Sequence, residues 1–155
     1  MTDFGQKITF EYKKVIDAET RKVSEFPGIT LVLGEGNKSF ETTAIIDSGS
    51  DTCLIPEWLA EELGLKLGDE DRAEVVGGTH IITRLSKVKM MFKAGKNIIN
   101  LGHIPVAVGV GMKDKEEKLD IILGRNPIFD MFKITFEQYK KQVTFEKVNP
   151  KWRPY

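Results

Sequence analysis

The sequence contains few of the residues that form disulfides or bind metals. It has one cysteine, Cys53, and two histidines, His80 and His103, among 155 residues. A single cysteine cannot form an internal disulfide, and two histidines far apart in the chain make no metal-ligand cluster. We therefore expect no metal, no cofactor, and a reducing, cytoplasmic setting.

The sequence also lacks long apolar segments and an excess of one charge. The Met1–Phe10 segment has no apolar core of the kind found in signal peptides, and no apolar run approaches the length needed to span a bilayer. The 23 Lys and Arg residues balance 23 Asp and Glu residues, so no strong field draws the chain to nucleic acid or to an anionic membrane. We expect neither nucleic acid nor membrane as a partner.

Short strands separated by turns fill most of the chain. With 41% hydrophobic residues, the chain is able to bury roughly two-thirds of its unfolded surface. No repeat, low-complexity tract or linker divides it, so we expect one domain over residues 1–155. The pattern predicts an all-β barrel or sandwich with few helices. The expected strands are Ile29–Leu33, Phe40–Ile46, a hairpin over Val75–Val88, Val88–Phe92, Ile98–Leu101, Pro105–Val110 and Ile121–Leu123.

Further elements are expected near the ends of the chain and in its middle. A helix should begin at Pro56, which suits a first turn, and end at Gly64 as a left-handed cap. A second, short helix is expected from Asn126-Pro127 through Phe132, and the tail Pro150–Tyr155 should be loose. Alternating residues predict one hairpin that joins Lys7–Tyr12 to Val23–Phe26, and another that joins Ile134–Glu137 to Val143–Glu146.

One stretch carries a candidate catalytic group. Between Ile45 and Pro56, an apolar strand ends at Asp47, and a hydroxyl and a glycine follow at Ser48 and Gly49. Asp and Ser often form turns by accepting hydrogen bonds from nearby main-chain N–H groups, and Gly supplies positive φ angles. A carboxylate in this place is therefore either a catalyst or a turn former.

Three segments resemble the aspartic proteases. Residues 44–56, AIIDSGSDTCLIP, look like the active-site loop, in which Asp, then Thr or Ser, then Gly and a small residue follow a hydrophobic strand. Leu119–Asn126 resembles the hydrophobic-hydrophobic-Gly segment, with its Arg-Asn sequel, that supports this loop in retropepsins. Val75–Ile82 is similar to the glycine-tipped flap hairpin that closes over substrate. From about Gly28 to Phe136, the chain resembles a retropepsin-like aspartic protease of cellular, prokaryotic type.

This resemblance implies an all-β, retropepsin-like, partly closed β-barrel with one or two short helices. The protease core would span residues 28–136, after an N-terminal hairpin extension (1–27) and before a C-terminal hairpin strand and tail (137–155). The viral members of the family dimerise by interleaving their terminal strands. The extensions in this chain leave open how a dimer is built.

The family's mechanism needs two carboxylates. One takes a proton from water while its protonated partner donates to the scissile carbonyl, and the two share a proton because both cannot hold a full charge in contact. The chain has only one Asp-Ser-Gly, since Asp17, Asp120 and Asp130 lack a following Ser/Thr-Gly. The second Asp47 must then come from another copy. The resemblance therefore implies a homodimer with its active site on the two-fold axis, acting on a peptide or protein substrate.

Neighbouring residues acquire roles from the same resemblance. Ser48, Gly49 and Ser50 would support the loop, with Ser48 in place of the usual Thr and Gly49 allowing the substrate backbone to approach closely. Asp51 matches a position that binds substrate main chain and pairs with the Arg of the Gly-Arg-Asn segment. We therefore predict an ion pair between Asp51 and Arg125. The residues expected to give structural support to the loop are Gly124, Arg125 and Asn126.

In the flap, two glycines would allow a mobile tip whose main-chain N–H groups reach the substrate. An ordinary hairpin turn is equally open as an interpretation. Beneath the site, Cys53 and Leu54 are expected to pack, and a reactive thiol is the less favoured reading because no nearby His or Lys activates it. The flap residues expected to bind substrate are Val76, Gly77, Gly78 and Thr79.

Two alternatives to the peptidase remain open. The first is a catalytically silent dimeric peptide-binding or regulatory module with the same fold, in which Asp47 is structural. The second is a β-barrel that binds small ligands or nucleic acid. This second alternative predicts a monomer, or a basic and aromatic face that the neutral sequence does not display.

Overall fold

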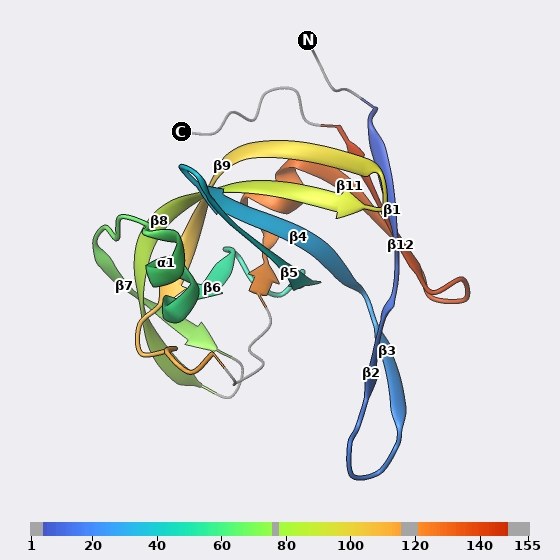
Figure 1. The fold of residues 1–155 in the computed structure, drawn as a ribbon, viewed down its shortest axis with the longest axis horizontal. Helices are drawn as coiled ribbons and strands as arrows, with labels where there is room; N and C mark the ends of the chain where they lie inside the picture. The colour runs from blue at the N-terminus through green and yellow to red at the C-terminus, as the bar shows by residue number, and fades with distance from the viewer. Residues whose placement is uncertain (1–4, 76–77, 116–120, 149–155) are drawn as a thin grey trace.

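A computed structural model describes residues 5–75, 78–115 and 121–148, and its centre is a ring of six strands. Each strand of the ring pairs with the next, and β4 pairs with β8 from Leu31↔Phe92 to Gly34↔Lys89, which closes the barrel (Figure 1). A seventh strand, β7 (Glu70–Val75), pairs with the far edge of β8. The all-β barrel predicted from the sequence is confirmed. Its strands in ring order are β4 (Gly28–Glu35), β5 (Lys38–Ile46), β10 (Ile121–Leu123), β6 (Leu54–Pro56), β9 (Asn97–Gly109) and β8 (Thr79–Ala94).

Alternating side chains fill the interior of the barrel. Successive residues of a strand point to opposite faces, so residues two apart share a face. On β4, Ile29, Leu31 and Leu33 are fully buried, and on β8 the same spacing buries Met90 and Phe92. Strand pairing and burial of these apolar rows together hold the barrel as one packed body.

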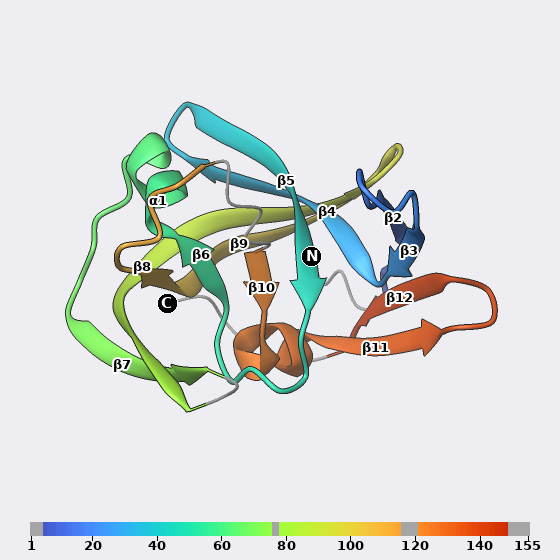
Figure 2. The same cartoon turned by 90° about the horizontal axis from the view of Figure 1, so that it is seen from below.

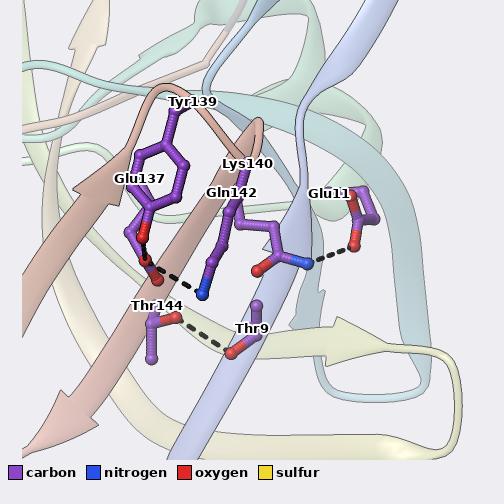
Figure 3. A network of polar contacts seen from close by, with 7 residues as sticks. All are labelled: Thr9, Glu11, Glu137, Tyr139, Lys140, Gln142 and Thr144. Atoms are coloured by element: carbon purple, nitrogen blue, oxygen red, sulfur yellow. Dashed lines mark hydrogen bonds and ion pairs between the residues drawn. The ribbon is translucent and has the colours of Figure 1, made fainter.

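A second sheet lies against the barrel and has the order β1-β12-β11. One face of it joins an aromatic cluster, in which the ring of Phe145 lies 4.9 Å from that of Phe92 on β8. The opposite face is polar: the hydroxyls of Thr9 and Thr144 are hydrogen-bonded at 2.9 Å, and Gln142 donates to Glu11 (Figure 3). The predicted C-terminal hairpin is confirmed. The strands of this sheet are β1 (Lys7–Glu11), β12 (Gln142–Lys147) and β11 (Phe132–Glu137).

The predicted pairing of the N-terminal hairpin is partly wrong. The strand that pairs with β3 (Val23–Phe26) is β2 (Lys13–Ile16), whereas β1 pairs with β12. Pairing with β12 buries Ile8 and Phe10 almost completely, which a two-stranded hairpin could not do. The β2–β3 hairpin instead extends away from the barrel (Figure 1).

The helices of the described residues are short. Helix α1 (Glu57–Leu63) follows Pro56 and ends at Gly64, whose φ of 69° is left-handed, as the sequence predicts. A second helical segment, η1 (Arg125–Phe129), connects β10 to β11. None of the helices in the described ranges is both long and apolar enough to cross a bilayer.

Candidate active site

The loop that carries Asp47 connects β5 to β6 and is held by β10. Strand β10 lies between them, parallel to β5 and antiparallel to β6 (Figure 2). Leu123, the last residue of β10, pairs with Ile46, and its carbonyl accepts the main-chain N–H of Asp47 at 3.0 Å. Asp47 therefore lies where a buried strand gives way to a loop.

The carboxylate of Asp47 is partly buried and takes part in a local turn. Its Oδ1 atom accepts the N–H of Gly49 at 2.8 Å, and the main-chain carbonyl of Asp47 accepts the N–H of Ser50 at 3.2 Å. Among the residues that the structure describes, the other carboxylate oxygen accepts no hydrogen bond. The turn thus fixes the carboxylate through one oxygen and leaves the second available to a ligand.

The segment after β10 packs directly on this loop. A Cβ atom at Gly124 would overlap the main-chain carbonyl of Thr52, so only glycine fits without a shift. The next main-chain N–H groups bond the loop: that of Arg125 donates to the carbonyl of Ser50 at 2.8 Å, and that of Asn126 to the carbonyl of Asp51 at 3.0 Å. The residues after β10 therefore hold the loop through main-chain atoms.

The predicted ion pair between Asp51 and Arg125 is not formed. Both side chains are exposed, and neither takes part in an ion pair among the residues with a described position. An exposed ion pair gains little over hydration of its two charges, so nothing draws these side chains together in the single chain. The main-chain bonds of the same two residues make the connection.

The remaining candidate residues lie on the loop or at the tip of the β7–β8 hairpin. Ser48 and Gly49 are exposed, and the hydroxyl of Ser50 donates to the carbonyl of Thr52 at 2.8 Å. Gly78 and Thr79 are exposed. The end of β7 and the start of β8 lie on the same side of the molecule as the β5–β6 loop (Figure 2). Val76, Gly77, Leu119 and Asp120 lie outside the described ranges, as does the tail Pro150–Tyr155 that the sequence analysis expects to be loose.

Cys53 packs beneath the loop, as predicted. Its side chain is fully buried, and this burial raises the pKa of the thiol to about 11, although the main-chain N–H of Gly124 acts in the opposite direction. The thiol is therefore protonated near neutral pH and makes a poor nucleophile. Among the described residues, no three His, Cys, Asp or Glu side chains gather in a group that could hold a metal ion.

A groove beside the loop was not indicated by the sequence. It has a volume of about 910 Å³, and its wall includes Thr52, Asn126, Leu85 of β8 and Val106 of β9. Asp47 is not among its lining residues, so the groove meets the loop at Thr52 rather than at the carboxylate. Leu85 is 53% exposed and Ile82, on the same strand, is 46% exposed, and the sequence alone does not show which apolar residues of β8 face outward.

Comparisons with known proteins point to one family. The model of the aspartyl protease family matches residues 32–126. No curated protein matches the chain in sequence. Among solved structures, a retropepsin-like aspartic protease from Rickettsia conorii is similar with a TM-score of 0.53 and 13% identity, over 91% of this chain and 90% of that one. EIAV protease complexed with the inhibitor HBY-793 is similar with a TM-score of 0.43 and 19% identity, over 74% of this chain and 93% of that one.

Proposed function

Because the chain belongs to the aspartyl protease family and has a retropepsin-like fold, we propose that it is an aspartic endopeptidase that cleaves extended peptide segments. The observation that carries the proposal is the setting of Asp47. The carboxylate stands at the end of a buried strand and is fixed through Oδ1 by the N–H of Gly49, and its second oxygen accepts no hydrogen bond from the residues with a described position. A group that must bind water and exchange protons needs this combination of fixed position and free oxygen.

The working enzyme in this proposal is a homodimer. Peptide hydrolysis by this route needs an ionised carboxylate as base and a protonated one as acid, and the chain has a single Asp-Ser-Gly. Two copies related by a two-fold axis would place one Asp47 beside the other. At that distance the pair shares one proton, because two adjacent full charges repel each other. The ionised member takes a proton from water as it attacks the carbonyl, and the protonated member donates to the carbonyl oxygen.

The other loop residues position this pair. The exposed hydroxyl of Ser48 would hydrogen-bond across the axis, and Ser50 holds the loop through its bond to the carbonyl of Thr52. Gly49 leaves room for the substrate backbone beside the carboxylates. Asp51, whose side chain is exposed, would bind substrate main chain.

The substrate would lie as an extended strand between this loop and the tip of the β7–β8 hairpin. Main-chain hydrogen bonds would give affinity, and side-chain pockets would give preference. Closure of the hairpin would exclude water from the reaction. The hairpin residues assigned to substrate are Val76, Gly77, Gly78 and Thr79. We assign the protease core to residues 28–136, within one domain over residues 1–155, and the protein to a reducing, cytoplasmic setting.

The proposal is tested by digestion of a peptide library from acid to neutral pH, read by mass spectrometry. Asp47→Asn should abolish cleavage and keep the fold, because the amide oxygen can still accept the N–H of Gly49 but cannot act as a base. Asp130→Asn is the matched control, since Asp130 is an exposed aspartate at the end of η1, and it should cleave like the native protein. Cleavage that survives in Asp47→Asn would refute the proposed mechanism. A native protein that stays dimeric and cleaves nothing would favour a peptide-binding module.

A further inference from the structure

Strand β11 has an unpaired outer edge. It pairs with β12 on one side, and within the described residues no strand pairs with the other side. The N–H of Val148 donates to the carbonyl of Met131, so the main-chain groups of Met131 point toward β12. Along an antiparallel strand these groups alternate in direction, so every second residue after Met131 also points toward β12 and the residues between them point away. The N–H and C=O groups of Ile134 and Phe136 are therefore turned toward the outer edge. Such an edge is a template for another strand.

The apolar face of the terminal sheet continues to this edge. One row across the sheet runs from Phe10 through Val143 to Phe136. Phe10 and Val143 are buried against the barrel, but Phe136 is 45% exposed. In the next row Ile134 is also only partly buried. The hydrophobic layer thus extends past the strands that the single chain provides.

The same edge lies on the side of the molecule that carries Asp47. Segment η1 leads from the Gly124-Arg125 contact with the loop into β11. Figure 2 shows the β5–β6 loop, η1 and β11 along one edge of the molecule, with β12 beside β11 on its inner side. A second copy that approaches the outer edge of β11 therefore also approaches the loop of Asp47.

The sequence of β11 is complementary to itself in one antiparallel register. In this register Thr135 of one copy lies opposite Thr135 of the other. A residue before Thr135 in one copy then faces the residue that follows Thr135 by the same number of positions in the other copy. Lys133 then lies opposite Glu137, and Ile134 lies opposite Phe136, each pair occurring twice. On the polar face this register joins opposite charges, and on the other face it joins the two apolar side chains that the single chain leaves uncovered.

The charge of Glu137 is present near neutral pH. Its carboxylate accepts a hydrogen bond from the hydroxyl of Tyr139 at 2.9 Å and lies 3.4 Å from the ammonium of Lys140 (Figure 3). The bond from Tyr139, followed by the contact with Lys140, lowers the pKa of this carboxyl. Lys133 is exposed on the same face of β11.

Building on the homodimer of the proposed function, we propose that two copies join through the outer edges of their β11 strands. Thr135 lies on the two-fold axis, and the two terminal sheets become one sheet of six strands. Each subunit keeps its own β1 and β12, so no terminal strand is exchanged between subunits. This arrangement differs from interleaved termini and explains why the chain carries the extra β1 and β12 strands beside β11.

Reversal of the charge at Lys133 or at Glu137 tests the register. We expect Lys133→Glu and Glu137→Lys each to raise the dissociation constant of the dimer about tenfold or more in sedimentation velocity, because each creates two like-charge pairs. An equimolar mixture of the two variants should recover the dimer, since Glu then faces Lys in both pairs. The double variant should recover it for the same reason. Lys7→Glu, on β1 at the opposite edge of the sheet, is the control and should dimerise like the native protein.

Cysteine cross-linking gives a second readout. Thr135→Cys should form a covalent dimer on mild oxidation, because residues opposite each other in a non-hydrogen-bonded pair lie about 4.5 Å apart, within disulfide range. Glu137→Cys should not form a covalent dimer, because residue 137 of each copy lies opposite Lys133 of the other copy and not opposite residue 137. Native Cys53 is buried and does not compete.

The outcomes separate this dimer surface from the proposed function. Suppose that the native protein is dimeric and cleaves peptides. If the charge variants then dimerise like the native protein, or if their mixture does not recover the dimer, the β11 surface is overturned and the peptidase proposal stands. A native protein that is monomeric at every concentration would overturn both.

Discussion

The main-chain N–H of Asp47 donates a hydrogen bond to the carbonyl of Leu123 at 3.0 Å. The two residues are far apart in sequence, so the bond exists only when β10 is inserted between β5 and β6. Formation of the candidate active site is therefore coupled to completion of the barrel. The residue that follows, Gly124, lies so close to the loop that an added Cβ atom would overlap the main-chain carbonyl of Thr52.

Gly124→Ala should destabilise the protein and displace the loop of Asp47. The added methyl group would overlap the carbonyl of Thr52, and it would approach the carbonyl oxygen of Ser50 to 2.8 Å. Overpacking of this kind costs roughly 1–3 kcal/mol of the free energy of unfolding. Chemical denaturation measures the loss, and peptide cleavage should fall by more than the folded fraction does.

The neighbouring Arg125→Ala is the control for this prediction. It keeps the main-chain N–H that bonds the carbonyl of Ser50, and the removed side chain is exposed and makes no ion pair in the described ranges. The free energy of unfolding should change by only about 0.5 kcal/mol or less. A loss as large as that of Gly124→Ala would contradict a main-chain connection between the two segments.

Cys53 should resist thiol reagents in the folded protein. Burial raises the pKa of its thiol to about 11, so little thiolate exists at neutral pH. An unfolded cysteine ionises near pH 8.5, so the unfolded state loses its proton first and the free energy of unfolding should fall as the pH rises from there toward 11. We expect labelling at pH 7 only after denaturant is added, and unchanged peptidase activity after treatment. Rapid labelling of the native protein, with loss of activity, would contradict the buried position.

Phe145→Ala should separate the terminal sheet from the barrel. Phe145 is fully buried, and its ring contacts those of Phe10, Phe92 and Phe132 at centroid distances of 4.9–5.8 Å. Loss of a buried aromatic ring costs roughly 3–5 kcal/mol of the free energy of unfolding. Tyr139→Ala, at a ring that is 79% exposed on the β11–β12 turn, should cost much less in the same denaturation experiment. Equal losses would argue against the aromatic cluster as the contact between sheet and barrel.

Much of the barrel could be predicted because its signals are local. Strands β4 and β5, helix α1 with its Gly64 cap, and the C-terminal hairpin each follow from alternation or capping within a few residues. The pairing of β4 with β8 has no such signal, since alternation shows which face of a strand is buried and not which strand lies beside it. For the same reason the alternation in Lys7–Tyr12 predicts a strand but not its partner, which is β12 and not Val23–Phe26. Pairing with β12 is what buries Ile8 and Phe10.

The candidate site divides in the same way. The Asp-Ser-Gly motif and the Gly-Arg-Asn motif each consist of consecutive residues, so the sequence indicates both segments and their order along the chain. The expected Asp51–Arg125 ion pair depends on side chains that water solvates equally well, and the structure connects these residues through the main chain. The groove lined by Thr52 and Leu85 could not be foreseen, because it arises where separate strands meet.

Subunit mixing tests most directly the claim that one active site needs Asp47 from two chains. Native protein and Asp47→Asn are combined at equal amounts, allowed to exchange subunits, and assayed at constant total concentration. Mixed dimers hold one carboxylate and should be inactive, so activity should fall to about a quarter of that of the native protein if subunits combine at random. Activity of about one half would mean that each chain works alone, and would contradict the shared site.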